Sequence, residues 1–406
     1  MLRLTEKDLL KTSSWQPIRA HSKTLTEKSL VKRLEKHIKM GLINTLANIV
    51  TKTTTLKKMV LAATVWALLS SCSEQTLSCP VSPNIADLTS DVSPIHDPSM
   101  IKVKGAYYLY SSSDLGSFYR SENMREWVLE GEVFAQLPAW LKEQIPVADH
   151  IGAPDIAYYG GRYLLFYQSH KSNTCNAATG LATNTTLDPS DPNYEWVDQG
   201  LILRSEPFYE GVDIYCGNEK ATFNAIDAHF TQDSDGKPWL VFGSTIGGIK
   251  LVALDPQTLQ LADEHEFITL AQRWLLQDDP IIEAPHIVQR HGYYYLFMSF
   301  NHCCLDDKTQ YQIRVGRAEK ITGPYYDKSG WPLYLEGGTL LIDKDDRFIG
   351  TGHNDVYSES GQDWLVHHGK DPAEAYKAYL HIRELNWDKE DWPTACVKTR
   401  LVSKLL

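Results

Sequence analysis

Five stretches of the chain repeat one pattern, and this repeat restricts the possible folds more than any other feature. Each stretch contains a polar residue, a short apolar run, a turn with glycine and an aromatic-rich run, which together are typical of a β-hairpin. The five stretches are HDPSMIKVKGAYYLYSS from His96, GAPDIAYYGGRYLLFYQS from Gly152, NAIDAHFTQDSDGKPWLVFGS from Asn224, EAPHIVQRHGYYYLFMSF from Glu283 and GHNDVYSESGQDWLVHHG from Gly352.

The polar residues that head these stretches are Asp97, Asp155, Asp227, His286 and Asp355, at spacings of 58, 72, 59 and 69 residues. A period of this size fits a propeller blade of four strands with long loops, and helical periodicity between the stretches is weak. The sequence therefore predicts an all-β, five-bladed β-propeller over residues 91–400. In such a ring, equivalent positions of the five blades meet at one end of the central channel.

Three of the acids suggest chemistry rather than turn formation. Glycosidic bond cleavage needs two carboxyl groups in different protonation states. Glu283 lies in the apolar segment IIEAPHI, which favours a raised pKa and the role of general acid. Asp97 is a plausible general base, and Asp227 could orient the acid and raise its pKa by like-charge repulsion. The alternative for each acid alone is a turn or strand-cap residue.

An ordered set of motifs resembles glycoside hydrolase family 43, and within it the endo-arabinanases, over about residues 90–395. The motifs are HDPS (96–99), APDI (153–156), GLATNTTLDP (180–189), NAIDAHF (224–230), DGKPWLVFGSTIGGIKL (235–251), IEAPHIVQRHGYYYLFMSF (282–300), CC (303–304), ITGPYYDKSG (321–330), GGTLL (337–341) and GTGHNDV (350–356). HDP alone is shared with neighbouring propeller families, so the complete order carries the resemblance.

The resemblance implies an inverting hydrolase of internal α-1,5-L-arabinofuranosidic bonds in arabinan. Asp97 matches the general base, Glu283 the general acid, and Asp227 the acid that tunes the donor and orients substrate. Inversion requires space for a water between Asp97 and Glu283, with carboxyl groups roughly 6.5–9.5 Å apart.

The resemblance also implies a metal in the channel, usually calcium, faced by His353. Because calcium prefers oxygen ligands, the rest of its shell is expected to be mostly water. The alternative for His353 alone is a turn residue with its hydrogen bonds satisfied.

Five further residues are candidates for substrate binding. Asp155, Asn224, Ser244 and His286 are expected to rim the pocket and hydrogen-bond sugar hydroxyls, or else to cap hairpins. Phe300 is either a stacking face for a sugar or a core residue.

One position departs from the family pattern. Relatives commonly carry tryptophan where this chain has Gly152, so a stacking face near the cleavage point is missing. Insertions at 170–178 and 205–222 are further candidates for reshaping the groove.

The N-terminal segment has the layout of an export signal. Two lysines precede the apolar run Met59–Leu69, which is too short to span a membrane, and LSSC follows it. This ending resembles a bacterial lipoprotein box with Cys72 as the lipidated residue; the alternative is a plain secretory signal. We predict that residues 1–72 lie outside the fold and that 73–90 form a linker; Met40 is an alternative start codon.

The cysteines other than Cys72 are Cys79, Cys175, Cys216, Cys303, Cys304 and Cys396. Export permits disulfides. A Cys79–Cys396 bridge would suit a closed ring, and a Cys175–Cys216 bridge between the two insertions is an alternative. The adjacent pair at 303–304 is not expected to bridge to itself. No cysteine spacing resembles a zinc site.

Charge is divided unevenly along the chain. Residues 1–72 carry 13 basic and 4 acidic residues, whereas the remainder carries 27 and 47. Such an acidic body repels polyanions, so we expect no nucleic-acid partner and a neutral substrate such as arabinan.

Two rival functions remain open at this point. One is an exo-acting α-L-arabinofuranosidase or β-xylosidase of the same family, and the other is a non-catalytic glycan-binding lipoprotein. The predicted protein is a monomer that contacts a membrane only through its lipid anchor. Its expected location is the outer membrane or periplasm of a Gram-negative cell, or otherwise the medium.

Overall fold

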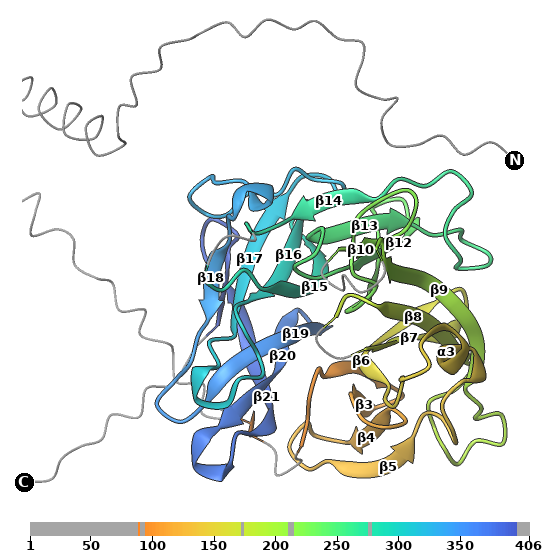
Figure 1. Cartoon of the computed structure of the whole chain (residues 1–406). Helices are drawn as coiled ribbons and strands as arrows, with labels where there is room; N and C mark the ends of the chain where they lie inside the picture. The colour runs from red at the N-terminus through yellow and green to blue at the C-terminus, as the bar shows by residue number, and fades with distance from the viewer. Residues whose placement is uncertain (1–87, 90–93, 172–173, 210–214, 275–277, 396–406) are drawn as a thin grey trace, which may run out of the picture. The chain divides into compact units, whose positions relative to one another are not determined.

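The innermost strand of each repeat forms part of a closed ring around a central channel (Figure 1). These five strands are β2 (Ser99–Val103), β6 (Gly152–Tyr159), β11 (His229–Gln232), β15 (Ile282–Arg290) and β19 (Ile349–Glu359). Each packs against the next, and β19 packs against β2, which closes the cycle. The computed structural model describes residues 88–89, 94–171, 174–209, 215–274 and 278–395. The prediction of an all-β, five-bladed propeller is confirmed.

Each innermost strand begins an antiparallel sheet that forms one blade. Blade 1 continues with β3 (Ala106–Ser111), β4 (Ser117–Ser121) and β5 (Val128–Glu132), and the helix α3 (Ala139–Gln144) follows it. Blade 2 continues with β7 (Arg162–His170), β8 (Ala177–Asn184), β9 (Val197–Pro207) and the short β10 (Cys216–Gly217). Blade 3 continues with β12 (Pro238–Phe242), β13 (Ile249–Ala253) and β14 (Ile268–Ala271).

The last two blades contain the short 3₁₀ helices. Blade 4 continues with β16 (Tyr293–Phe300), β17 (Gln312–Ala318) and β18 (Thr339–Ile342), with η1 (Asp306–Lys308) and η2 (Leu333–Leu335) in its loops. Blade 5 continues with β20 (Gln362–Asp371), η3 (Pro372–Glu374) and β21 (Lys377–Trp387). Both β1 (Leu88–Thr89) and β22 (Pro393–Ala395) pair with β21, so segments from the two ends of the fold complete this blade.

Tight turns join the first two strands of four blades. Lys104 and Gly105 both have positive φ, at 50° and 94°, and the pairs Gly160–Gly161, His291–Gly292 and Ser360–Gly361 follow the same rule. Two successive residues with positive φ match the right-handed twist of a hairpin. The glycine turns of the repeat are therefore the sequence signal that sets the hairpin register.

Apolar side chains fill the spaces between neighbouring blades. Tyr110 of blade 1 and Tyr167 of blade 2 share one buried cluster, and equivalent clusters join every other adjacent pair of blades, including blade 5 with blade 1. Burial of apolar surface at five interfaces holds the ring together and fixes the inner strands against one another. Among the described residues, no helix has both the length and the apolar character needed to span a bilayer.

One long-range covalent link stabilises blade 2. Cys175 and Cys216 are disulfide-bonded across 41 residues of chain, as the alternative pairing predicted. Cys72, Cys79 and Cys396 lie outside the described residues, so the lipidation and the Cys79–Cys396 bridge stay predictions. The predicted extension at 1–72 lies outside them too, as does the predicted linker apart from residues 88–89.

Candidate active site

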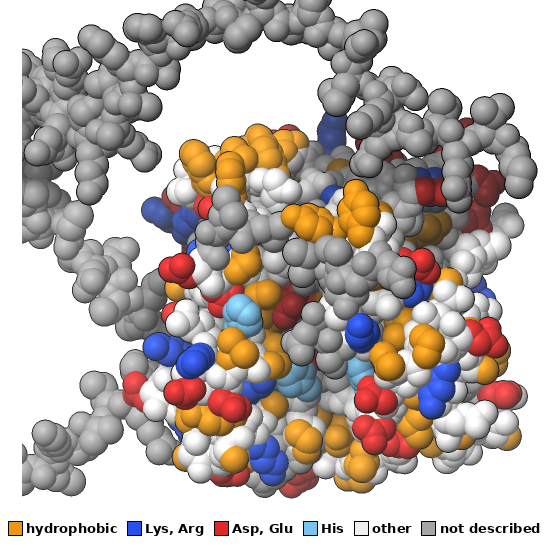
Figure 2. All heavy atoms as spheres, in the orientation of Figure 1, with side chains coloured by type: hydrophobic (Ala, Val, Ile, Leu, Met, Phe, Trp, Pro, Cys, Tyr) orange, Lys and Arg blue, Asp and Glu red, His pale blue; other side chains and the backbone are white. Residues whose placement is uncertain are grey.

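The five innermost strands share an unusual backbone feature at one mouth of the channel. Asp97, Ala153, Asp227, Ala284 and His353 occupy equivalent positions and have φ values of 52°, 40°, 55°, 53° and 50°. Left-handed conformations are uncommon outside glycine and cluster at functional sites. We call these residues the upper ring. Figure 2 shows histidine and acidic side chains around a hollow at the centre of the molecular face.

The upper ring brings together the three acids that the sequence singled out. Asp97 and Asp227 belong to it, and Glu283 immediately precedes its member Ala284. Asp227 is buried and Asp97 and Glu283 are partly buried, and the negative charge of Asp97 acts on Asp227 while the charges of Asp227 and Asp97 act on Glu283. The sequence prediction that these distant acids share one site is confirmed.

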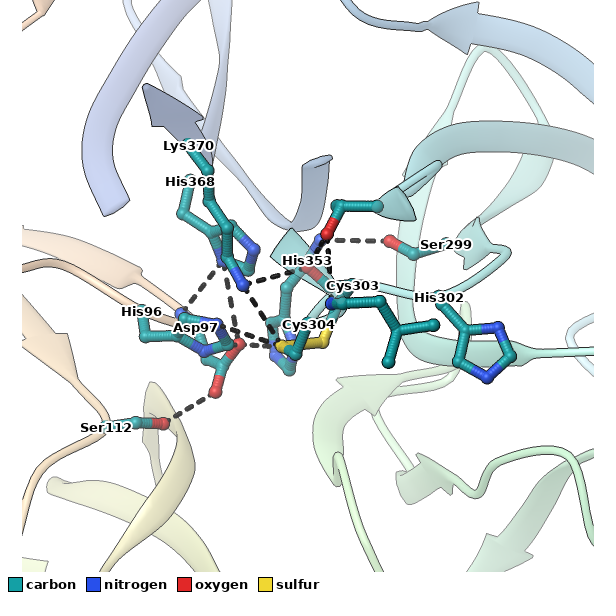
Figure 3. The surroundings of a disulfide bond; sticks show 12 residues. His96, Asp97, Ser112, Ser299, His302, Cys303, Cys304, His353, His368 and Lys370 are labelled. Atoms are coloured by element: carbon teal, nitrogen blue, oxygen red, sulfur yellow. Dashed lines mark hydrogen bonds and ion pairs between the residues drawn. A yellow bond between two sulfur atoms is a disulfide. The ribbon is translucent and has the colours of Figure 1, made fainter. Parts of the chain in front are cut away.

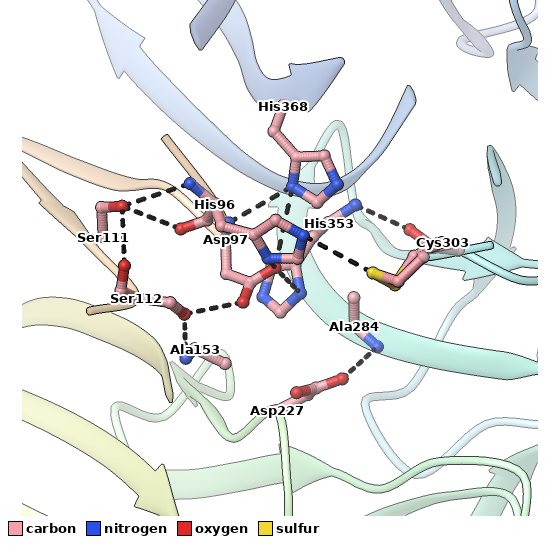
Figure 4. A network of polar contacts seen from close by, with 12 residues as sticks. His96, Asp97, Ser111, Ser112, Ala153, Asp227, Ala284, Cys303, His353 and His368 are labelled. Carbon is pink, nitrogen blue, oxygen red and sulfur yellow. Dashed lines mark hydrogen bonds and ion pairs between the residues drawn. A yellow bond between two sulfur atoms is a disulfide. The ribbon is translucent and has the colours of Figure 1, made fainter. Parts of the chain in front are cut away.

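Asp97 is held as a carboxylate by hydrogen-bond donors and imidazoles (Figure 4). Its Oδ2 accepts a hydrogen bond from Ser112 Oγ at 2.7 Å, and its Oδ1 lies 2.8 Å from His96 Nδ1 and 3.1 Å from His353 Nδ1. Burial alone would raise the pKa of Asp97, but His353, His96 and His368 together hold this pKa well below its usual value. Asp97 is therefore ionised at neutral pH, as a general base must be.

Asp227 accepts hydrogen bonds on both carboxylate oxygens. Gln168 Nε2 donates to Oδ1 and the amide of Ala284 donates to Oδ2, each at 3.1 Å. Burial and the charge of Asp97 nevertheless raise the pKa of Asp227 to about 7. Asp227 thus lies next to the strand that carries Glu283 and is fixed to it through the backbone.

Glu283 is the group best suited to carry a proton. Burial, followed by the repulsion of Asp227, raises the pKa of Glu283 to about 7. Asp227 accepts two hydrogen bonds that favour its ionised form, so we assign the proton of this pair to Glu283. Tyr311 also hydrogen-bonds Glu283 and is itself buried.

A glycine makes room for Tyr311. A Cβ atom added to Gly352 would lie 2.0 Å from the Tyr311 ring. The glycine immediately before His353 in the motif GTGHNDV is therefore required by the close approach of the ring that contacts the general acid. Gly352 and Tyr311 together fix the wall of the site between blades 4 and 5.

The prediction that Asp155, His286 and Asp355 meet the catalytic acids at one mouth is wrong. These residues lie two positions further along their strands, in a second layer that we call the lower ring. The lower ring consists of Ser99, Asp155, His229, His286 and Asp355.

Contacts between neighbours close the lower ring. Asp155 Oδ1 lies 2.7 Å from His229 Nδ1, the rings of His229 and His286 are 3.7 Å apart, and His286 Nε2 is 3.4 Å from Asp355 Oδ1. Ser99 Oγ donates to Asp355 Oδ2 at 3.2 Å. All but Ser99 line a cavity of about 350 Å³ that extends along the distal halves of the inner strands, away from the catalytic acids. Asp155 thus links β6 to β11 and His286 links β15 to β19, and neither lies at the rim of the catalytic mouth.

The other three predicted substrate contacts, Asn224, Ser244 and Phe300, are all buried. Asn224 and Ser244 are buried near the start of β11 and the end of β12, and their contact with a sugar stays a prediction. Phe300 is only 4% exposed and packs beside the guanidinium groups of Arg273 and Arg314, at 4.6 and 5.2 Å from the ring centre. The core alternative for Phe300 is thus confirmed, and its role as a stacking face is wrong.

Sequence reasoning missed several groups that support the acids. Ser112, Gln168, Ser299 and His368 all lie near the ends of the second strands, which return to the catalytic mouth. Ser299 Oγ accepts from the amide of His353 at 2.9 Å, and His368 Nδ1 accepts from the amide of Asp97 at 3.2 Å. The signal that could have found them is the polar residue ending each aromatic run, as in YSSS, FYQS, FMSF and VHHG.

The expectation that Cys303 and Cys304 do not bridge to each other is also wrong. The two adjacent cysteines form a disulfide in the loop after β16, as Figure 3 shows. This loop crosses from blade 4 towards Asp97, so the bridge lies at the catalytic mouth.

The residues around Asp97 limit how a metal could be held. His96, Asp97 and His368 place potential ligand atoms within 4.8 Å of one another, and His353 lies beside them. This set offers imidazole nitrogens and one carboxylate, whereas calcium takes six to eight oxygen ligands. It fits calcium only where water completes most of the coordination shell.

A propeller channel that combines an ionised carboxylate with a carboxyl group whose pKa is raised to about 7 has the machinery of a glycoside hydrolase. The profile of Glycosyl hydrolases family 43 matches residues 93–393, and the chain belongs to this family. The family resemblance of the sequence motifs is thereby confirmed.

Individual relatives align over most of the fold. The extracellular exo-α-(1→5)-L-arabinofuranosidase ArbA of Cellvibrio japonicus is 36% identical over 307 residues, covering 74% of this chain and 85% of that protein. The extracellular endo-α-(1→5)-L-arabinanase 1 of Bacillus subtilis is 33% identical over 305 residues, covering 74% and 87%. The solved structure of Cellvibrio cellulosa α-L-arabinanase complexed with arabinohexaose has a TM-score of 0.69 and 35% identity, covering 75% of this chain and 96% of that one.

Proposed function

We propose that this protein hydrolyses α-(1→5)-linked arabinan at internal bonds with inversion of configuration. The observation that carries the proposal is the pairing of an ionised Asp97 with a Glu283 whose pKa is raised to about 7 at the same mouth. Relatives that align over most of the fold are named for action on α-(1→5)-linked arabinose polymers, which supports this substrate.

The proposed chemistry follows from which carboxyl group accepts a proton and which one donates it. Asp97 removes a proton from water as the water attacks the anomeric carbon, while Glu283 protonates the departing arabinosyl oxygen. Ser112 and the imidazole of His353 keep the Asp97 carboxylate oriented. Asp227 keeps the Glu283 pKa high and, through the Ala284 amide, fixes the strand that carries Glu283.

Exo action is the second candidate, because the relative at 36% identity is named as an exo-acting arabinofuranosidase. Linear debranched arabinan distinguishes the two modes when incubated with wild type and Glu283→Gln. A ladder of short oligomers from wild type and none from the variant supports endo action; release of one product size from chain ends supports exo action. Intact binding without any product would indicate a glycan-binding protein instead.

We also propose a calcium ion in the channel, held largely through water near His353. His353 Nδ1 faces Asp97, and among the described residues no hydrogen bond engages its Nε2, which leaves this nitrogen for the channel. A cation there would add positive charge beside the carboxylate of the base. Chelation followed by calcium titration tests this: the melting temperature and activity should both recover with calcium, and an unchanged melting temperature throughout would contradict it.

We further propose export and lipidation at Cys72 on a monomeric protein. Export is supported by relatives named extracellular and by the buried Cys175–Cys216 disulfide, since such bonds persist in oxidising compartments. The LSSC ending of the N-terminal apolar run supports the lipid anchor. Palmitate labelling that disappears in Cys72→Ala would support lipidation, whereas an unlabelled protein released into the medium would refute it.

A further inference from the structure

The Cys303–Cys304 disulfide lies one imidazole away from the general base (Figure 3). Cys304 Sγ is 3.7 Å from His96 Nε2, and the other nitrogen of His96 lies 2.8 Å from Asp97 Oδ1. Lys370 Nζ donates to the Cys303 carbonyl oxygen at 2.8 Å and lies 3.2 Å from Cys304 Sγ. The disulfide is therefore fixed at the mouth by blade 5 while it borders the catalytic carboxylate from blade 1.

The Cys303–Cys304 disulfide contributes little to the stability of the fold. The bond joins neighbouring residues, so it closes almost no loop and removes little entropy from the unfolded chain. Cys175 and Cys216 provide the contrast, because they join residues 41 apart and are almost completely buried. Cys304 is instead exposed. Because the Cys303–Cys304 disulfide adds little stability and Cys304 is exposed at the active site, its role is expected at the active site itself.

Three described positions at the mouth offer no aromatic face to a sugar ring. Gly152 has no side chain, and Phe300 and Tyr311 are both buried. Exposed apolar surface is present instead at Cys304 and at Leu305, whose side chain is 46% exposed. Sulfur is polarisable and uncharged, so it packs well against the C–H groups of a sugar ring. The groups next to it, by contrast, are imidazoles, an ammonium and a carboxylate.

We propose that the Cys303–Cys304 disulfide is a substrate-contacting element that packs against the pentose ring bound beside Asp97. This inference rests on the proposed arabinan hydrolysis and assigns one wall of that site. The disulfide supplies an uncharged surface within a charged mouth and so favours a neutral sugar ring at this position.

The double variant Cys303→Ala/Cys304→Ala tests the inference, with Cys175→Ala/Cys216→Ala as the matched control. On linear arabino-oligosaccharides, the first variant should lose roughly tenfold in kcat/KM, mainly through KM, as expected for a lost apolar contact. Its pH profile and melting temperature should stay close to those of wild type. The control should melt at a lower temperature and keep its KM within about twofold.

Binding measurements separate this inference from the proposed function. Calorimetry of arabino-oligosaccharides with Glu283→Gln, with and without the change at Cys303 and Cys304, should show about tenfold weaker binding for the cysteine variant. This result would support the contact even if wild type hydrolysed nothing. Equal affinities, or no binding by either protein, would overturn it. A shifted pH profile with unchanged KM would also overturn it, because the disulfide would then act only by positioning His96.

Reduction of an otherwise intact site provides the second test. In the Cys175→Ala/Cys216→Ala background, a mild thiol reductant converts Cys303 and Cys304 to two thiols without changing any other described disulfide. KM should rise on reduction and return on reoxidation. A KM that is indifferent to reduction, after thiol titration confirms that the bond has opened, would contradict a role for the joined sulfurs.

Discussion

The carboxylate of Asp227 accepts a hydrogen bond, at 3.1 Å, from the backbone amide of Ala284, the residue that follows the general acid. This bond ties the heads of β11 and β15 together and places a negative charge beside Glu283. The roles of the acids therefore depend on closure of the ring, because blade 4 supplies the proton donor Glu283 and blade 3 supplies Asp227, which raises the donor's pKa.

The fall of kcat/KM at alkaline pH, the alkaline limb of the pH profile, depends on the influence of Asp227 on the Glu283 pKa. Glu283 acts while protonated, so kcat/KM should fall as pH rises through about 7. Asp227→Asn removes the neighbouring charge and should lower the Glu283 pKa by on the order of one unit, which moves the alkaline limb towards acid. Initial rates from pH 4 to 9 measure the shift. Asp233→Asn, on the turn between β11 and β12, is the control and should leave the limb in place.

Leaving-group chemistry separates the roles of Glu283 and Asp97. Glu283→Gln should reduce kcat/KM on arabinan by about 10²–10⁴-fold, because the departing oxygen is no longer protonated. With an aryl arabino-oligosaccharide, whose phenolate departs without a proton, the loss should be much smaller. Asp97→Asn should remain defective on both substrates. Equal losses for Glu283→Gln on the two substrates would rule out its assignment as the acid.

Gly352→Ala tests the packing behind the acid. The new Cβ would meet the Tyr311 ring at 2.0 Å, and overpacking of this kind costs about 1–3 kcal/mol. Both the free energy of unfolding and kcat should decrease, because Tyr311 contacts Glu283. Gly316→Ala, where the Cβ would meet Leu333 at 2.5 Å, should lower stability alone. A fully active Gly352→Ala enzyme would show that Tyr311 is not needed at this position.

Asp155→Asn tests the assignment of the lower ring. Asp155 pairs with His229, and its Oδ2 accepts from the amide of Phe230 at 2.9 Å. Loss of the charged pair in this buried setting should destabilise the fold by about 1–3 kcal/mol. KM for arabino-oligosaccharides should remain within about twofold of wild type. A KM increase at unchanged melting temperature would instead indicate that Asp155 contacts the substrate.

The repeat in the sequence predicted the ring but assigned its polar residues to one layer instead of two. Side chains two positions apart on a strand point to the same side, so alternation does not tell which inward polar residue stands at the mouth. Asp97 and Asp227 were assigned to the catalytic layer correctly. Asp155, His286 and Asp355 were also assigned to it, but they lie two residues further along their strands, in the lower ring. Only the closed contacts of the lower ring resolve this ambiguity.

The supporting groups were harder to predict for a different reason. Ser112 and His368 reach Asp97 through strand pairing within a blade and packing between blades. Ser112, Gln168, Ser299 and His368 each follow the upper-ring residue of their own blade by 15 residues, but which of these side chains reaches an acid depends on packing between blades. The bond between Cys303 and Cys304 was likewise missed because adjacent cysteines seldom pair, and its place at the mouth depends on a loop path that no local pattern encodes.

The configuration of the first-formed product tests most directly whether Asp97 activates water rather than attacking the sugar. Proton NMR during early hydrolysis of an α-linked arabino-oligosaccharide distinguishes the two anomers before mutarotation mixes them. The account predicts that the new reducing end appears first as the β-anomer. Initial release of the α-anomer would contradict it, because retention requires a covalent intermediate on the residue assigned here as the base.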